Sequence, residues 1–192
     1  MYYNQKNYPN ILYPGPTRRN ATAADGACGV CAMSMVLEEI IPDFHFPIEE
    51  AVPYAIKRAY GDDIGGTNMN FLSKGVKEDF GVEFVQTNEM SDLVEHLKKG
   101  LPAIALVGGN HDDYIGVFTA GGHFITVKGL LPDGRLIIWD PSKVPGKYDI
   151  EGRKGKVELG PNDEVYCTQQ VLADDTDICN TRYWLYFPPK KA

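Results

Sequence analysis

The pattern of hydrophobic residues divides the chain into two halves. Up to residue 100, apolar positions mostly recur at the three- and four-residue spacing of helices, whereas the later apolar segments are short, as in strands. The first half predicts helices over residues 28–41, 47–59, 67–80 and 91–99, with a short strand over 82–86. The second half predicts strands over residues 102–107, 122–130, 135–140, 156–159 and 182–187. Helices first and strands second favour an α+β fold over a doubly wound parallel sheet.

The first predicted helix, residues 28–41, is apolar on nearly every face and is therefore expected to lie inside the protein. The second is expected to end at Gly61, although Pro53 within it disfavours a helix. Thr67 is the expected N-cap of the third helix, and Gly81 its expected end.

Cys28 stands at the start of the buried helix, directly after the turn-forming Asp25-Gly26-Ala27. The N–H groups of the first helical turn and the helix dipole favour negative charge there, and so favour the thiolate over the thiol. Residues 1–27 contain several Pro, Gly and Asn residues and are expected to form an extended segment. The position of Cys28 therefore suits a nucleophile.

A predicted β-hairpin brings two more reactive side chains to one rim of the sheet. Its turn is Leu131-Pro132-Asp133-Gly134, a strong hairpin signal. Because an antiparallel hairpin returns the chain to the end where it started, His123 at its beginning and Asp140 at its end are expected to lie close together. Together with Cys28 they would supply a nucleophile, a base and a carboxylate that orients the base.

Composition narrows the classes of partner. The 192 residues, 43% of them hydrophobic, fit a single domain over residues 1–192. A net charge of -7 argues against binding to nucleic acid or to an anionic membrane. Residues 1–20 lack the features of a signal peptide and no apolar run is long enough to span a bilayer, so we expect a protein that is cytoplasmic or released by a non-classical route. The oligomeric state stays open.

Several blocks of the sequence resemble the papain-like cysteine peptidases related to the double-glycine leader peptidases of bacteriocin export systems, here as a stand-alone domain. The resemblance spans roughly residues 3–141. The matching blocks are Tyr3-Asn4-Gln5 with Tyr8-Pro9, Cys28-Gly29-Val30-Cys31 with Met35-Val36-Leu37, and Gly122-His123-Phe124-Ile125 with Asp140-Pro141.

The resemblance implies a papain-like fold, in which an N-terminal helical half with a buried nucleophile helix packs on a C-terminal antiparallel sheet. It also implies a triad of Cys28, His123 and Asp140, with Gln5 helping to form the oxyanion hole. Such an enzyme would cleave a peptide or isopeptide bond through a thioester, using no metal or cofactor. The departures are a long interval between Gln5 and Cys28, and Val30 and Cys31 where the family more often has proline and threonine.

Other interpretations of the same residues stay open. An acyltransferase or a cell-wall lysin would use the same triad on a different substrate. A thiol-disulfide redox protein would use the C-x-x-C pair Cys28 and Cys31, although no strand is predicted before it, and a peptide-binding module would keep the fold without catalysis. Cys167 and Cys179 could pair, but their spacing does not decide it.

Overall fold

An antiparallel sheet forms the middle layer of the fold. In a computed structural model, which describes residues 1–15, 18–58 and 66–190, the sheet has seven strands in the order β1-β7-β2-β3-β4-β6-β5. The strands are β1 (Glu83–Thr87), β2 (Ala103–Val107), β3 (His123–Leu130), β4 (Leu136–Trp139), β5 (Val157–Leu159), β6 (Glu164–Cys167) and β7 (Tyr183–Phe187).

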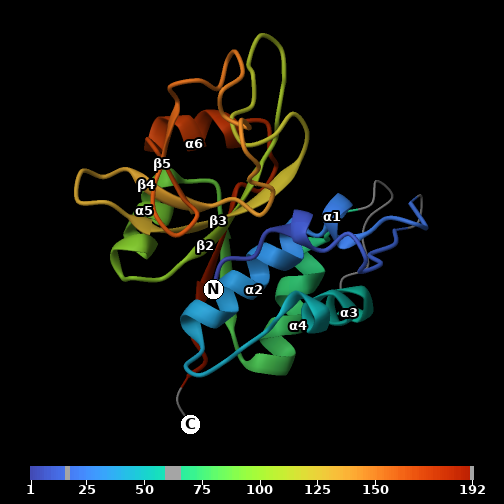
Figure 1. Cartoon of the computed structure of the whole chain (residues 1–192). Helices are drawn as coiled ribbons and strands as arrows, with labels where there is room; N and C mark the ends of the chain where they lie inside the picture. The colour runs from blue at the N-terminus through green and yellow to red at the C-terminus, as the bar shows by residue number, and fades with distance from the viewer. Residues whose placement is uncertain (16–17, 59–65, 191–192) are drawn as a thin grey trace.

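Helices cover both faces of this sheet (Figure 1). They are α1 (Ala23–Gly26), α2 (Cys28–Ile40), α3 (Ile48–Arg58), α4 (Met69–Phe80), α5 (Met90–Lys98) and α6 (Gln169–Thr176), preceded by a 3-10 turn, η1 (Gln5–Asn7). One apolar core lies between α2, α3, α4 and the sheet, and a second lies between the sheet and α5 and α6. The expected α+β fold, with a helical N-terminal half packed on an antiparallel sheet, is confirmed.

Helix α2 lies within the protein because nearly all of its side chains are apolar and buried. It packs against the central strands, and Thr126 on β3 donates a hydrogen bond from Oγ1 to the Ala32 carbonyl of α2 at 3.3 Å. Sheet and helix are therefore joined by a buried polar contact as well as by apolar packing, which fixes α2 against β3.

The ends of the helices agree with the sequence in part. Helix α4 ends at Gly81, whose positive φ of 72° suits a glycine cap, as predicted. Its predicted N-cap was wrong: the side chain of Asn68, not Thr67, accepts the hydrogen bond of the Phe71 N–H. Thr67 is buried, and its hydroxyl hydrogen-bonds with that of Tyr13.

Two regions need correction, while the helix predicted over residues 47–59 is present as α3. Helix α3 continues through Pro53 to Arg58, and the expected end at Gly61 lies outside the described residues. Strand β6 and helix α6 occupy a region where the sequence predicted neither. The N-terminal segment is extended for much of its length but contains η1 and α1, of which α1 begins with a capping box between Thr22 and Asp25.

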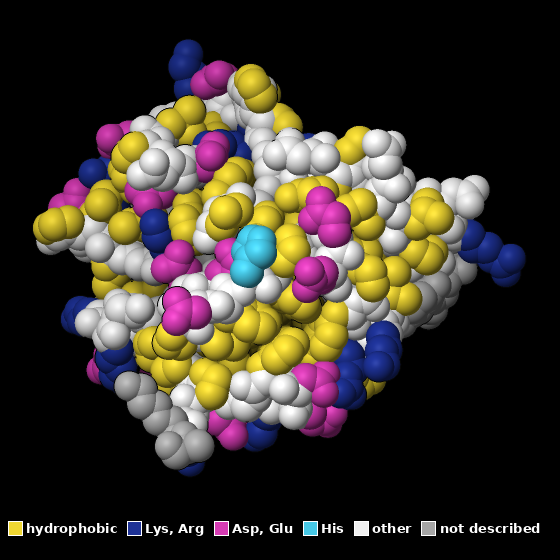
Figure 2. Space-filling view, turned by 60° about the horizontal axis from the view of Figure 1, so that its bottom comes forward, with side chains coloured by type: hydrophobic (Ala, Val, Ile, Leu, Met, Phe, Trp, Pro, Cys, Tyr) yellow, Lys and Arg dark blue, Asp and Glu magenta, His cyan; other side chains and the backbone are white. Residues whose placement is uncertain are grey.

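The outer surface is of mixed character. On the face at the lower end of Figure 1, Asp and Glu side chains lie across the middle and Lys and Arg lie mainly towards the margins (Figure 2). Hydrophobic side chains cover much of the area between them (Figure 2). Within the part of the chain that the structure describes, no helix is both long and apolar enough to cross a membrane.

Candidate active site

The β3–β4 hairpin brings His123 and Asp140 together, as its turn predicts. In its register Thr126 pairs with Trp139, which sets the first residue of β3 opposite the segment that follows β4. The His123 ring donates from Nε2 to Asp140 Oδ1 at 2.8 Å. Both side chains are buried, His123 at 5% exposure and Asp140 at 0%. The contact therefore holds the ring in one tautomer, with the proton on Nε2 and Nδ1 facing away from the carboxylate.

Asp140 is surrounded by hydrogen-bond donors. Besides His123, its Oδ1 accepts from the Ser142 N–H at 2.9 Å, and its Oδ2 accepts from Lys147 Nζ and Tyr148 Oη at 2.5 Å each. Burial alone would raise the pKa of Asp140, but the hydrogen bond and charge of His123, together with the charge of Lys147, outweigh it and hold the pKa well below the usual range. Asp140 is thus a buried carboxylate that stays ionised.

Lys147 links this carboxylate to a neighbouring serine. Its Nζ donates to Ser142 Oγ at 2.7 Å, and that hydroxyl lies 3.1 Å from His123 Nε2. Burial lowers the pKa of Lys147, although the adjacent Asp140 opposes that shift. Lys147, Ser142 and Asp140 together form a polar network behind the imidazole ring, and this network was not predicted.

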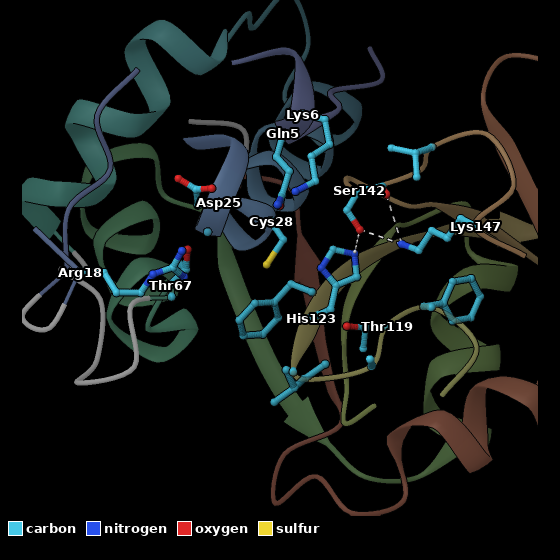
Figure 3. A pocket seen from close by; sticks show the side chains of 18 of the residues that line it. Gln5, Lys6, Arg18, Asp25, Cys28, Thr67, Thr119, His123, Ser142 and Lys147 are labelled. Atoms are coloured by element: carbon cyan, nitrogen blue, oxygen red, sulfur yellow. Dashed lines mark hydrogen bonds between the residues drawn. The ribbon is translucent and has the colours of Figure 1, made fainter. Parts of the chain in front are cut away.

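Cys28 approaches the imidazole from the other layer of the fold. It is the first residue of α2, and its sulfur and the His123 ring point toward one another (Figure 3). Burial opposes the thiolate, but the charge and hydrogen bond of His123, with N–H groups of Phe124 and Gly29, hold the pKa of Cys28 below its ordinary value. His123 responds in turn: burial opposes its protonation, but the charge of Cys28 and the contact with Asp140 raise its pKa to about 9.

Gln5 lies beside the thiol, on the segment that precedes α1. Its backbone N–H donates to the Pro141 carbonyl at 2.7 Å, which ties this segment to the rim that carries Asp140. Its side-chain Nε2 donates to the Ala24 carbonyl at 3.0 Å and points toward Cys28 (Figure 3). Lys6 Nζ donates to the same carbonyl at 2.8 Å. In a continuous helix the Cys28 N–H would donate to the Ala24 carbonyl. Here the side chains of Gln5 and Lys6 donate to that carbonyl instead.

All four sequence-predicted side chains therefore gather at one place, and three of them, Gln5, Cys28 and His123, line a cleft of about 720 Å³. Asp140 lies behind the ring and is sealed from the cleft. The Cys28 N–H and the second N–H of the Gln5 amide are the donors that could form an oxyanion hole next to the thiol. Chemically, the arrangement suits attack of a thiolate on a carbonyl carbon.

The sequence analysis missed Ser142, Lys147, Tyr148 and Arg153. All lie on the connection between β4 and β5, which has no helical or strand periodicity from which their orientation could be inferred. The only available signal was their proximity in sequence to Asp140.

The remaining cysteines differ from Cys28. All four cysteines are free thiols, so Cys167 and Cys179 are not paired in this structure. Cys31 lies one turn deeper in α2 with no exposed surface, and burial raises its pKa well above the ordinary value. In the described segments, no group of three or more His, Cys, Asp or Glu side chains is arranged to hold a metal ion.

Comparisons with known proteins bear on the family and the fold of the chain. A model of the peptidase C39-like family matches residues 1–159. A crystal structure from Bacillus anthracis, assigned as a C39-like peptidase, superposes with a TM-score of 0.58 over 100% of both chains at 12% sequence identity, a likeness of fold. No curated protein matches the sequence.

Proposed function

The chain belongs to the peptidase C39-like family, and we propose that it is a cysteine hydrolase that cleaves a peptide or isopeptide bond. The family resemblance drawn from the sequence is thereby confirmed. In the proposed reaction Cys28 is the nucleophile, His123 the general acid and base, and Asp140 the residue that orients the imidazole. Gln5 and the Cys28 N–H stabilise the oxyanion.

The proposed reaction proceeds in two halves. The Cys28 thiolate attacks the carbonyl carbon, and the oxyanion that forms accepts hydrogen bonds from Gln5 Nε2 and the Cys28 N–H. The C–N bond then breaks as the His123 imidazolium gives its proton to the leaving amine, which leaves a thioester on Cys28. His123 next takes a proton from water, the hydroxide attacks the thioester carbonyl, and the acid product leaves as the thiolate is restored.

The observation that carries the proposal is the 2.8 Å contact between His123 Nε2 and a fully buried, ionised Asp140, beside a thiol with a lowered pKa. A histidine without a catalytic role, or an aspartate that only forms a turn, would not need a buried carboxylate held by several hydrogen-bond donors. The donors that keep Asp140 charged are costly to assemble inside a protein, which supports a role for the charge itself.

The test is amide hydrolysis of a mixed peptide library, followed by mass spectrometry. We expect Cys28→Ala to abolish cleavage, and the matched variant Cys31→Ser to retain it, because Cys31 is sealed in the core. Electrophilic labelling at neutral pH should modify Cys28 before Cys31. Full cleavage by Cys28→Ala would refute the proposal.

The same experiments separate the other hypotheses. A redox protein requires Cys31, so loss of all activity in Cys31→Ser with a reversible Cys28–Cys31 disulfide would favour it. Transfer to an added amine, or release of fragments from peptidoglycan, would identify an acyltransferase or a lysin. A binding module would show no preferential alkylation of Cys28.

A further inference from the structure

Arg153 is a buried basic residue at the wall of the cleft with no acidic partner. It is 7% exposed, and it donates from Nε to the Gly116 carbonyl at 2.7 Å and from Nη1 to the Lys147 carbonyl at 3.3 Å. Both acceptors are uncharged, and across the described residues no carboxylate forms an ion pair with it. A buried charge without a counterion is costly. A guanidinium has five N–H donors, so Arg153 has donors left for an anion in the cleft.

The charged side chains that line the cleft also favour an anionic ligand. Four basic side chains and one acidic one line it, namely Lys6, Arg18, Lys147, Arg153 and Asp25. Asp140 balances Lys147, and Asp25 balances at most one of the remaining cations. The whole chain has 19 Lys and Arg against 26 Asp and Glu, so this positive balance is a local property of the cleft. Such a lining attracts anionic ligands.

Arg153 is also joined to the reacting groups by a short series of contacts. Its Nη1 holds the Lys147 carbonyl, the Lys147 ammonium holds Ser142 Oγ, and that hydroxyl lies 3.1 Å from His123 Nε2. The guanidinium therefore lies on the His123 side of the cleft, within the same lining that contains the imidazole.

We propose that this cleft selects peptide-like substrates that carry a carboxylate, which Arg153 binds with its free N–H groups. Because the planar guanidinium matches a carboxylate, such a contact gives both affinity and orientation. The carboxylate is either that of an Asp or Glu side chain or that of a chain terminus. The inference rests on the proposed function for its substrate class, but its test is a binding measurement that needs no catalysis.

The first probes are fluorescent hexapeptide mixtures that are blocked at both ends, and each has one position fixed as Glu or, in its neutral counterpart, as Gln. The second probes are a mixture that ends in a free C-terminal carboxylate and the same mixture ending in the C-terminal amide. Binding to the Cys28→Ala protein is measured by anisotropy. We expect one Glu mixture, or the free-acid mixture, to bind about tenfold more tightly than its neutral counterpart, as a charge-assisted hydrogen bond provides. Which mixture responds identifies the source of the carboxylate.

Variants then assign the preference to Arg153, each combined with Cys28→Ala. Arg153→Gln should abolish the preference and Arg153→Lys should retain part of it. Arg135→Gln removes the same charge from a side chain outside the cleft lining and should leave the preference unchanged. If Arg153→Gln fails to fold, judged by circular dichroism, the Arg153→Lys variant decides the matter, because an undiminished preference in that variant would contradict the role given to the guanidinium.

Two results would overturn the inference: equal binding of every charged and neutral pair, or a preference that survives in Arg153→Gln. These outcomes are separable from failure of the hydrolase proposal. Cleavage by the wild type without any acidic preference would leave the hydrolase intact and refute the role of Arg153. Preferential binding of the acidic probes without any cleavage by the wild type would support the role of Arg153 and count against the hydrolase proposal.

Discussion

Lys147 and His123 hold opposite oxygens of the same buried carboxylate. Lys147 Nζ lies 2.5 Å from Asp140 Oδ2, while His123 Nε2 lies 2.8 Å from Oδ1. Asp140 therefore shares one negative charge between two cationic partners. Because the lysine offsets part of that charge, it weakens the attraction between Asp140 and the imidazolium, and so limits how far the pKa of His123 rises.

Replacing Lys147 by Met should move the activity profile to higher pH. Without the ammonium, Asp140 stabilises the His123 imidazolium more strongly, and the Cys28 thiolate loses a nearby positive charge. Both limbs of the bell-shaped dependence of kcat/KM should therefore shift upward. The variant should also lose roughly 3 kcal/mol of unfolding free energy, since a buried ion pair loses one member.

Lys143→Met is the matched control for this change. Lys143 lies four residues earlier, but it pairs with the exposed Asp163 at 2.7 Å rather than with Asp140. Its loss should leave the pH profile in place and cost at most about 1 kcal/mol. Equal profiles for Lys147→Met and the wild type would contradict the role given to Lys147.

Under the proposed function, the unaltered protein should be active at pH values between the lowered pKa of Cys28 and the raised pKa of His123. Activity should rise as Cys28 loses its proton, at a pH below the ordinary thiol pKa, and fall as His123 loses its proton near pH 9. Asp140→Asn removes the charge that favours the imidazolium, so the alkaline limb should move down and kcat should drop. An unchanged alkaline limb, measured as kcat/KM on one peptide, would argue against this assignment.

His96 should make the fold sensitive to acid. It is 2% exposed, and its Nε2 donates to the Pro102 carbonyl at 3.1 Å. Burial lowers the pKa of His96, with a smaller contribution from the charge of Lys99. His96 therefore binds a proton more readily in the unfolded chain than in the folded one, so the free energy of unfolding falls as the pH drops below about 6.5.

His96→Gln should remove that part of the acid sensitivity. Urea unfolding at neutral pH and about two pH units lower would measure it, because other titrating groups cancel in the difference between wild type and variant. We expect the wild type to lose on the order of 1 kcal/mol more than the variant over that interval. Parallel losses in both proteins would show that His96 is not responsible.

Gly29 is expected to tolerate no side chain. A Cβ there would lie 2.7 Å from Thr67 Cβ and 3.1 Å from the Phe124 ring, on the residue next to the nucleophile. Gly29→Ala should therefore cost about 1–3 kcal/mol in unfolding free energy and reduce kcat. Gly121→Ala is the control, since a Cβ at Gly121 meets no atom within 4 Å. Equal stability of the two variants by urea denaturation would exclude this steric account.

Local patterns predicted those parts of the fold that depend on sequence neighbours. The apolar run of α2 and the Leu131-Pro132-Asp133-Gly134 turn each define their own element, and the structure contains both. Helix α6 has few apolar residues and was missed. Part of its support is long-range, because the buried Asp175 accepts hydrogen bonds from the N–H groups of Val117 and Phe118, almost sixty residues away.

In the candidate site, too, the features that depend on sequence neighbours were the ones that could be predicted. A hairpin brings its two ends together, so the sequence predicts that His123 and Asp140 lie near one rim. The irregularity between Val127 and Gly129, which sets their register, has no signal in the sequence. The expected helix cap at Thr67 was wrong, because its neighbour Asn68 is also of a residue type that caps helices and the hydrogen bond with Tyr13 draws Thr67 inward. Lys147 and Arg153 lie on an aperiodic connection, whose path depends on the layers it packs against.

The first few residues of the chain belong to the same site as residues far along it. Tyr2 Oη donates to the Asp140 carbonyl at 2.6 Å, and the Gln5 N–H donates to that of Pro141. Since Lys147 and Tyr148 complete the surroundings of Asp140, the site draws on both ends of a stretch of almost 150 residues. During synthesis the thiol would emerge from the ribosome well before its base. A growing chain would therefore carry Cys28 as a thiol without its imidazole partner until the residues around Asp140 have also been made.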